Sequence, residues 1–173
     1  MRVNLHDVMQ GAFFLIFEQQ YDSPVGPLTL ISDGKVLTGL RFSPAERPAA
    51  DVPVLAAGRR WLDTWFSGSA PSPRVLPLAP AATPFQALVR EILLDIPRGE
   101  YLTYGEVARI TARRLGRAHM SAQAVGGAVG ANPLPVIVPC HRVLASGGRL
   151  GGFSSGTEIK RRLLALENIR VTN

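Results

Sequence analysis

The sequence is poor in three features: it has one cysteine, two lysines and no long apolar run. A single cysteine, Cys140, excludes an internal disulfide framework and a cysteine-rich zinc site, so we expect no metal. It also fits a reducing compartment, and we expect the cytoplasm. The apolar run GAFFLIF, residues 11–17, is too short to cross a bilayer, so we expect a buried strand, no signal peptide and no membrane partner.

The charge is concentrated in one half of the chain. Residues 1–80 hold seven basic and seven acidic side chains, whereas residues 81–173 hold twelve and six, so the whole net charge of +6 lies in the second half. All the basic residues except Lys35 and Lys160 are arginines, which bind phosphates in a bidentate manner. A basic half indicates a polyanion such as nucleic acid as partner, although solubility alone explains the charge equally well.

The first half has the pattern of a small sheet with one helix. Residues 13–42 predict three antiparallel strands, with Asp33 and Gly34 forming a hairpin turn between the last two. Residues 54–68 show helical spacing that ends at Gly68, and the proline-rich residues 69–80 predict a connector. We therefore expect an α/β (α+β) protein with an N-terminal domain over residues 1–80, of which residues 1–12 are an extra segment.

The second half, residues 81–173, predicts a mainly helical domain. Thr83 is a candidate N-cap before Pro84, Thr103 is one with Glu106 three positions later, and Ser121 caps a third helix. The second and third helices, joined by a basic loop, are typical of a helix-turn-helix. A last helix, over residues 157–168, follows a loop that carries the cysteine.

Three glycines lie inside the third helix: Gly126, Gly127 and Gly130. Each costs about 1 kcal/mol relative to alanine, so something must approach this backbone closely. Either another helix packs against it or a nucleic-acid groove does, and the sequence alone leaves both open.

Cys140 stands between a buried segment and a glycine-rich loop. PVIVP precedes it, and His141 and the loop GGRLGGFSSG follow. A thiol with the ordinary pKa of about 8.5 needs a neighbouring base or cation to become a thiolate. Adjacent side chains on an extended chain point to opposite faces, so contact between Cys140 and His141 requires a bend or a bridging water. Glu167 is the best candidate to orient His141, and a Cys-His-acid set also serves hydrolases.

Several motifs resemble one family. PCHRV after NPLPVIV, TYGEVA and AVGGAVGANP before it, GGFSSG and LLALE after it, and SPVGPLTL and WLDTWFSG in the first half resemble the O6-alkylguanine-DNA alkyltransferases, the methylated-DNA–protein-cysteine S-methyltransferases. The resemblance implies direct DNA repair. A monomer without a cofactor would transfer the alkyl group from O6-alkylguanine in double-stranded DNA irreversibly to Cys140, once per molecule, with O4-alkylthymine as a second candidate substrate.

The resemblance also implies catalytic roles. The Cys140 thiolate would attack the alkyl carbon on guanine O6, a water would relay the proton to His141, and Glu167 would hold His141. Tyr104 would donate its phenol proton toward the purine ring, and Asn132 would tie the recognition helix to the Cys140 loop. Plainer explanations remain: Tyr104 as a core aromatic residue, Asn132 as a helix C-cap and Glu167 as a solvated charge.

DNA and the flipped guanine would be bound by two further sets of residues. The backbone carbonyls of Cys140 and Val143, the loop around Ser154, and Pro135 would surround the flipped base. The family places its helix-turn-helix in the minor groove of DNA. The residues that would then contact the DNA are Ser121, Ala122, Gln123, Ala124, Gly126, Gly127 and Ala128. Small side chains suit a groove only about 6 Å wide.

This sequence departs from the family at two positions. Gln123 stands where the family often has an arginine that fills the gap left by the flipped base, and Arg90 stands where a tryptophan is common. Arg142 is expected to contact a phosphate or form a structural salt bridge. Two alternative functions are weighed: a non-catalytic damage sensor, against which Cys140 argues, and a Cys-His hydrolase, which would turn over repeatedly.

Overall fold

The computed structural model describes residues 15–172. The predicted extra segment, residues 1–12, lies outside the described residues. The elements follow in the order β1 (Phe17–Ser23), β2 (Gly26–Ser32), β3 (Leu37–Arg41), α1 (Pro53–Phe66), α2 (Pro84–Leu94), β4 (Leu102–Thr103), α3 (Tyr104–Arg114), α4 (Ala122–Gly130), β5 (Val143–Leu144) and α5 (Thr157–Leu166), with short 3-10 turns at Pro73–Val75, Cys140–Arg142 and Ser146–Gly148. The predicted α/β class is confirmed.

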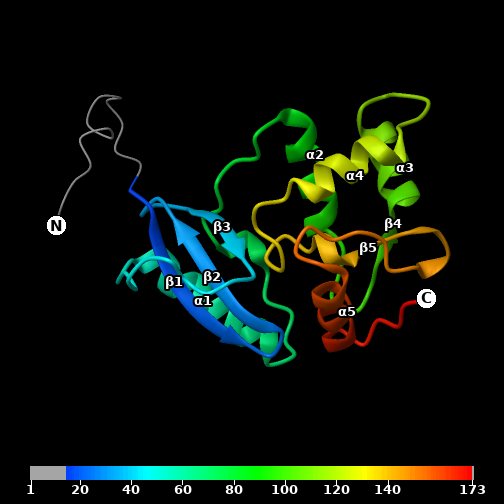
Figure 1. The fold of residues 1–173 in the computed structure, drawn as a ribbon. Helices are drawn as coiled ribbons and strands as arrows, with labels where there is room; N and C mark the ends of the chain where they lie inside the picture. The colour runs from blue at the N-terminus through cyan, green and yellow to red at the C-terminus, as the bar shows by residue number, and fades with distance from the viewer. Residues whose placement is uncertain (1–14, 173) are drawn as a thin grey trace.

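The first half is an antiparallel sheet covered by one helix (Figure 1). The predicted hairpin turn between β2 and β3 is present: Gly34 adopts φ 98°, and the Asp33 carboxylate accepts hydrogen bonds from the amides of Lys35 and Val36. Helix α1 packs closely on β2, because a Cβ atom at Gly58 would lie 3.2 Å from side-chain carbons of Leu30 and Leu37. The helix ends before Gly68, which has φ 97°.

The start of the first strand differs from the prediction. A buried strand was expected from residue 13, but β1 begins at Phe17, and Leu15 and Ile16 are 60% and 45% exposed. The register explains this difference. Phe17 pairs with Ser32, the last residue of β2, so the preceding residues have no β2 partner to extend the ladder. Residues 11–14 of the apolar run lie outside the described residues.

Three helices of the second half begin at their predicted caps. The Thr83 side chain accepts from the amide of Gln86, Thr103 and Glu106 form a reciprocal capping box, and the Ser121 hydroxyl accepts from two amides of α4. Helices α2 and α3 both pack against α4. The pair α3 and α4, joined by residues 115–121, has the predicted helix-turn-helix arrangement.

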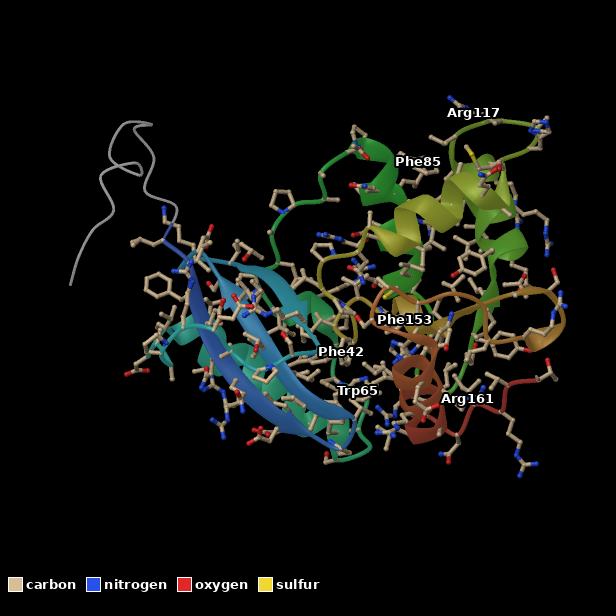
Figure 2. All side chains as sticks on the ribbon, in the orientation of Figure 1. Phe42, Trp65, Phe85, Arg117, Phe153 and Arg161 are labelled. Atoms are coloured by element: carbon tan, nitrogen blue, oxygen red, sulfur yellow. The ribbon has the colours of Figure 1, made fainter. Side chains whose placement is uncertain are left out.

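The two halves are joined by backbone and aromatic contacts. The Leu40 amide at the end of the sheet donates to the Pro133 carbonyl at 2.8 Å, and Phe42 meets Phe153 edge to face at 6.1 Å (Figure 2). Parallel pairing of β4 with β5 then brings the start of α3 beside the segment that follows Cys140. Within residues 15–172, no helix has the length and apolar character needed to cross a membrane.

Candidate active site

Cys140 begins a 3-10 turn that ends a buried segment. Residues 134–138 are almost fully buried, and Val136 adopts φ 71°, a left-handed conformation that is unfavourable for a β-branched residue. The turn Cys140–Arg142 bends the chain between Cys140 and His141, but His141 Nδ1 makes no hydrogen bond to a described residue, so contact with Cys140 still requires the bridging water. Cys140 is 4% exposed, so its thiol is reached only through a cavity.

A cavity of about 240 Å³ opens onto this thiol between α3, α4 and the glycine-rich loop. Of the residues predicted to surround a flipped base, Tyr104, Cys140 and Ser154 line it. Pro135 and Val143 are buried and are not among its lining residues. The complete lining is Tyr104, Gly126, Val129, Gly130, Cys140, Gly152, Phe153 and Ser154.

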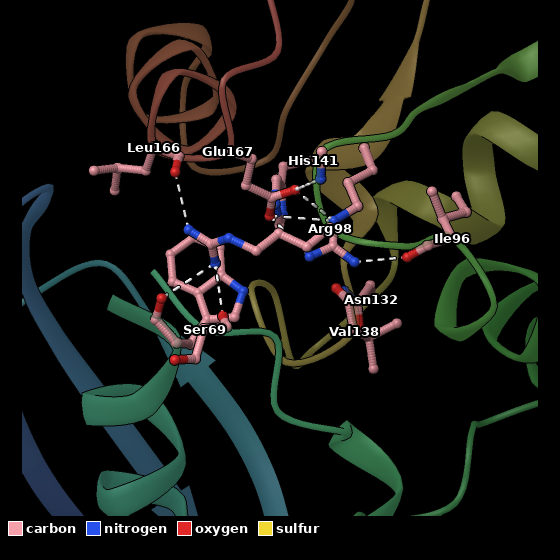
Figure 3. A network of polar contacts seen from close by, with 11 residues as sticks. Ser69, Ile96, Arg98, Asn132, Val138, His141, Leu166 and Glu167 are labelled. Carbon is pink, nitrogen blue, oxygen red and sulfur yellow. Dashed lines mark hydrogen bonds and ion pairs between the residues drawn. The ribbon is translucent and has the colours of Figure 1, made fainter. Parts of the chain in front are cut away.

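His141 lies in a fully buried network of polar groups. Its Nε2 lies 2.8 Å from Glu167 Oε1, as the order of motifs predicted. Sequence reasoning left the role of Arg142 open, and the structure shows a buried salt bridge: its guanidinium donates to both Glu167 oxygens at 2.8–3.1 Å and to the Ile96 carbonyl. The Gly99 amide donates to Glu167 Oε2 at 3.1 Å. The Glu167 carboxylate, seen beside His141 in Figure 3, is therefore held by His141, Arg142 and Gly99.

These contacts fix the protonation states of the pair. Burial would raise the pKa of Glu167, but the hydrogen bonds from His141 and Arg142 outweigh it and lower the pKa to about 2. Burial lowers the pKa of His141 despite the neighbouring carboxylate. The imidazole is therefore neutral at pH 7, with its Nε2 proton donated to Glu167. Its Nδ1 is buried without a hydrogen-bond partner among the described residues, which leaves it free to accept a proton.

The buried thiol itself is protonated at neutral pH. Burial raises the pKa of Cys140 to about 11, against the opposing effects of a hydrogen bond from the Asn132 side chain and the charge of Lys160. Asn132 also donates to the Val138 carbonyl at 3.0 Å, which ties the end of α4 to the segment before Cys140. Burial likewise raises the pKa of the Tyr104 phenol, so this group keeps its proton at neutral pH.

Lys160 is a site residue that sequence reasoning missed. Its fully buried ammonium donates to the carbonyls of Val143 at 2.6 Å and Gly152 at 3.1 Å, and lies 5.9 Å from the centre of the Tyr104 ring. Burial lowers the pKa of Lys160 to about 8. A signal was present, because Lys160 lies at helical spacing with the apolar Leu163 and Leu164, which places it on the buried face of α5.

The exposed face of α4 carries the predicted DNA-contacting residues. Ser121, Ala122, Gln123, Ala124 and Gly127 are exposed, whereas Gly126 and Ala128 are partly buried. A Cβ atom at Gly126 would lie 3.9 Å from the Tyr104 ring, but one at Gly127 or Gly130 would meet nothing within 4 Å. Packing of another helix therefore does not account for Gly127 and Gly130.

The arginines around this face of α4 differ in whether their charge is already paired within the protein. Arg117 lies in the loop before α4, at the far edge from the sheet (Figure 2), whereas Arg114 pairs with Asp95 at 3.2 Å. Arg90, which stands where the family commonly has tryptophan, donates to the Ala79 carbonyl at 2.6 Å and so fastens α2 to the connector.

Comparison with known proteins agrees with this geometry. The 6-O-methylguanine DNA methyltransferase ribonuclease-like domain matches residues 16–80, and the DNA binding domain of the same name matches residues 84–169. The methylated-DNA–protein-cysteine methyltransferase of Haemophilus influenzae is 38% identical over 162 residues, which cover 89% of this chain and 87% of the relative. The protein of that name from Mycobacterium tuberculosis is 40% identical over 162 residues, covering 90% and 94%.

Among solved structures, Mycobacterium tuberculosis OGT in complex with DNA superposes with a TM-score of 0.73 at 38% identity, covering 87% of this chain and 92% of that one. The sequence matches extend over both halves, and the structural likeness includes the fold that surrounds Cys140. The chain belongs to the 6-O-methylguanine DNA methyltransferase family.

Proposed function

We propose that Cys140 is the alkyl acceptor of this protein, and that each molecule reacts once. Membership of the family makes the protein a methylated-DNA–protein-cysteine methyltransferase, which repairs DNA directly by transferring an alkyl group to a cysteine. The observation that carries the assignment to Cys140 is its position in the lining of the cavity, next in sequence to a histidine whose Nδ1 has no partner among residues 15–172.

The chemistry follows from the protonation states. The thiol must lose its proton as sulfur attacks, and the neutral His141 accepts it at Nδ1, through the relaying water that the family resemblance implies. The Glu167 carboxylate, which is fixed by Arg142, stabilises the imidazolium that forms. The S–C bond forms as the bond from that carbon to O6 breaks, and the electron pair moves into the purine. Tyr104, still protonated, is placed in the cavity to donate a proton to the leaving base.

Duplex DNA with an alkylated guanine is the proposed substrate. Helix α4 would enter the minor groove through its exposed small residues, and Gly127 and Gly130 have open space where a sugar–phosphate wall could approach. The six excess positive charges of residues 81–173 would favour this polyanion.

We further propose that residues 1–80 and 81–173 are separate domains. Ser154, Pro135 and Val143 would contact the flipped base, and the protein would act as a cytoplasmic monomer.

The test is an intact-mass measurement after incubation with a duplex that contains one O6-methylguanine. We expect one added methyl group per molecule, located on the peptide that contains Cys140, and none on a Cys140→Ala variant. Multiple turnover with unmodified protein would favour the hydrolase alternative. Tight binding without any transfer would favour the damage sensor.

A further inference from the structure

The catalytic histidine is contacted from the first half of the chain as well as from the second. Trp65, in the last turn of α1, is 1% exposed and meets the His141 ring edge to face, with centroids 6.0 Å apart and planes at 88°. Glu167 holds the same ring at Nε2. With Glu167 fixing one nitrogen and Trp65 packed against the ring, rotation of the imidazole is opposed by both halves of the molecule.

Trp65 is in turn held by Arg98. The Arg98 guanidinium carbon lies 4.6 Å from the centre of the indole, within the range of a cation–π contact. The same group donates to the carbonyls of Trp65 at 3.1 Å and Ser69 at 3.3 Å, and through its other nitrogen to Leu166 at 2.9 Å (Figure 3). Arg98 therefore connects the end of α1 with the end of α5.

The position of these acceptors explains why one arginine can make this connection. The last carbonyls of a helix carry partial negative charge at its C-terminus, and both α1 and α5 end beside Arg98. The Trp65 carbonyl accepts from Arg98 in addition to the Gly68 amide. The Arg98 cation lies where these two helix ends converge. Leu166 immediately precedes Glu167, and Gly99, the neighbour of Arg98, donates to the Glu167 carboxylate. One short segment thus fixes both groups that contact His141.

We propose that Trp65 and Arg98 are positioning residues for proton transfer: they form a clamp between the two halves that keeps His141 Nδ1 directed toward Cys140. The inference rests on the proposed role of His141 as the proton acceptor. It gives the first half of the chain a part in thiol activation, in addition to any role as a scaffold. Loosening the clamp lowers the rate of transfer even from a substrate that makes no contact with DNA-binding residues.

The chain offers a conservative variant and a matched control. The Trp65 indole nitrogen is buried and has no hydrogen-bond partner among the described residues, so Trp65→Phe keeps an aromatic ring without breaking a bond. Trp61 lies one turn earlier in α1, is 5% exposed, and donates its indole N–H to the Ser72 carbonyl. Trp61→Leu therefore disturbs the same helix and the same core without removing the contact with His141.

The experiment measures single-turnover methyl transfer from free O6-methylguanine base, and the pH profile of Cys140 alkylation by iodoacetamide, in the full chain. Trp65→Leu and Arg98→Met should each slow transfer by about tenfold to a hundredfold, as expected for a misplaced catalytic group, and change the pH profile. Trp65→Phe should recover most of the rate. Because both residues act in one clamp, the double variant should be little slower than the slower single variant.

Each outcome discriminates. Trp61→Leu should lower the unfolding temperature as much as Trp65→Leu does and leave the rate and pH profile of the folded fraction unchanged. If the folded fractions of Trp65→Leu and Arg98→Met react at the wild-type rate with the wild-type pH profile, the clamp is only structural and the inference is wrong. Should Trp65→Leu fail to fold, Arg98→Met, altered at a partly exposed side chain, decides in the same way. If the wild type fails to react with a duplex that contains O6-methylguanine as well as with the free base, the proposed function is wrong.

Discussion

Replacement of Glu167 by glutamine should reveal how much stability the buried network contributes, because its carboxylate is fully buried and paired with Arg142. Removing one member of a buried ion pair leaves the other charge uncompensated and typically costs about 3–5 kcal/mol. We therefore expect Glu167→Gln to lower the free energy of unfolding by about that amount at pH 7. Urea denaturation followed by tryptophan fluorescence measures it.

The loss of unfolding free energy caused by Glu167→Gln should be smaller in acid. The pKa of Glu167 gives the size of this pH dependence. A carboxyl whose pKa falls from 4.5 to about 2 on folding contributes about 3 kcal/mol above pH 4.5, and loses it as the pH falls toward 2. Two-state linkage gives a loss of about 2 kcal/mol by pH 3. His141, whose pKa is lowered by burial and raised by Glu167, adds a second destabilisation below pH 6.5, and only the part caused by burial is common to both proteins. The informative quantity is therefore the difference between wild type and Glu167→Gln.

That difference should be about 2 kcal/mol smaller at pH 3 than at pH 7. A difference that stays constant over this range would refute the argument that the folded protein keeps Glu167 ionised. Glu158→Gln is the control, since Glu158 pairs with Arg162 at 3.1 Å on the exposed face of α5. A surface pair of this kind contributes less than about 1 kcal/mol, so this variant should remain close to the wild type at pH 7.

Three further predictions concern DNA. Gln123→Ala should slow transfer from duplex DNA and leave reaction with the free modified base unchanged, and Gln123→Arg should restore the duplex rate; equal duplex rates would assign Gln123 to a solvated face. Gly127→Leu, at a position open to solvent, should weaken duplex binding at least tenfold with little loss of thermal stability, whereas unchanged affinity would place the groove elsewhere. Duplex affinity should fall with salt at a log–log slope of about −0.9 per neutralised phosphate, and an affinity independent of salt would contradict binding through the basic half.

Local signals in the sequence predicted much of this fold. The Thr103 capping box, the turn at Gly34 and the Ser121 cap are each decided by residues a few positions apart, and the structure has all three. The start of β1 was predicted wrongly because a strand ends where its partner ends, and Ser32 sets that limit from the neighbouring strand. Hydrophobicity alone does not contain this information.

The contacts of the site were likewise predicted in part. The pairing of Glu167 with His141 was inferred from the order of the motifs, and it is present in the structure. The contacts of Trp65 and Arg98 could not be inferred, because each depends on how two helix ends from different halves meet. The sequence analysis gave Lys160 no role in the site, although its spacing placed it on the buried face of α5. Short-range periodicity was available for Lys160, whereas nothing in the sequence near Arg98 indicated its partners.

The long sequence separation of the contacts around His141 has a consequence for folding. His141 and Glu167 are 26 positions apart, Arg142 reaches back 46 positions to Ile96, and Arg98 reaches forward 68 positions to Leu166. Contacts of this kind require closure of long loops, and the entropy of that closure slows folding. In a partly folded second half Cys140 would lack an oriented base, and it would gain its proton acceptor only once the segment around Ile96, the Cys140 turn and the end of α5 have come together.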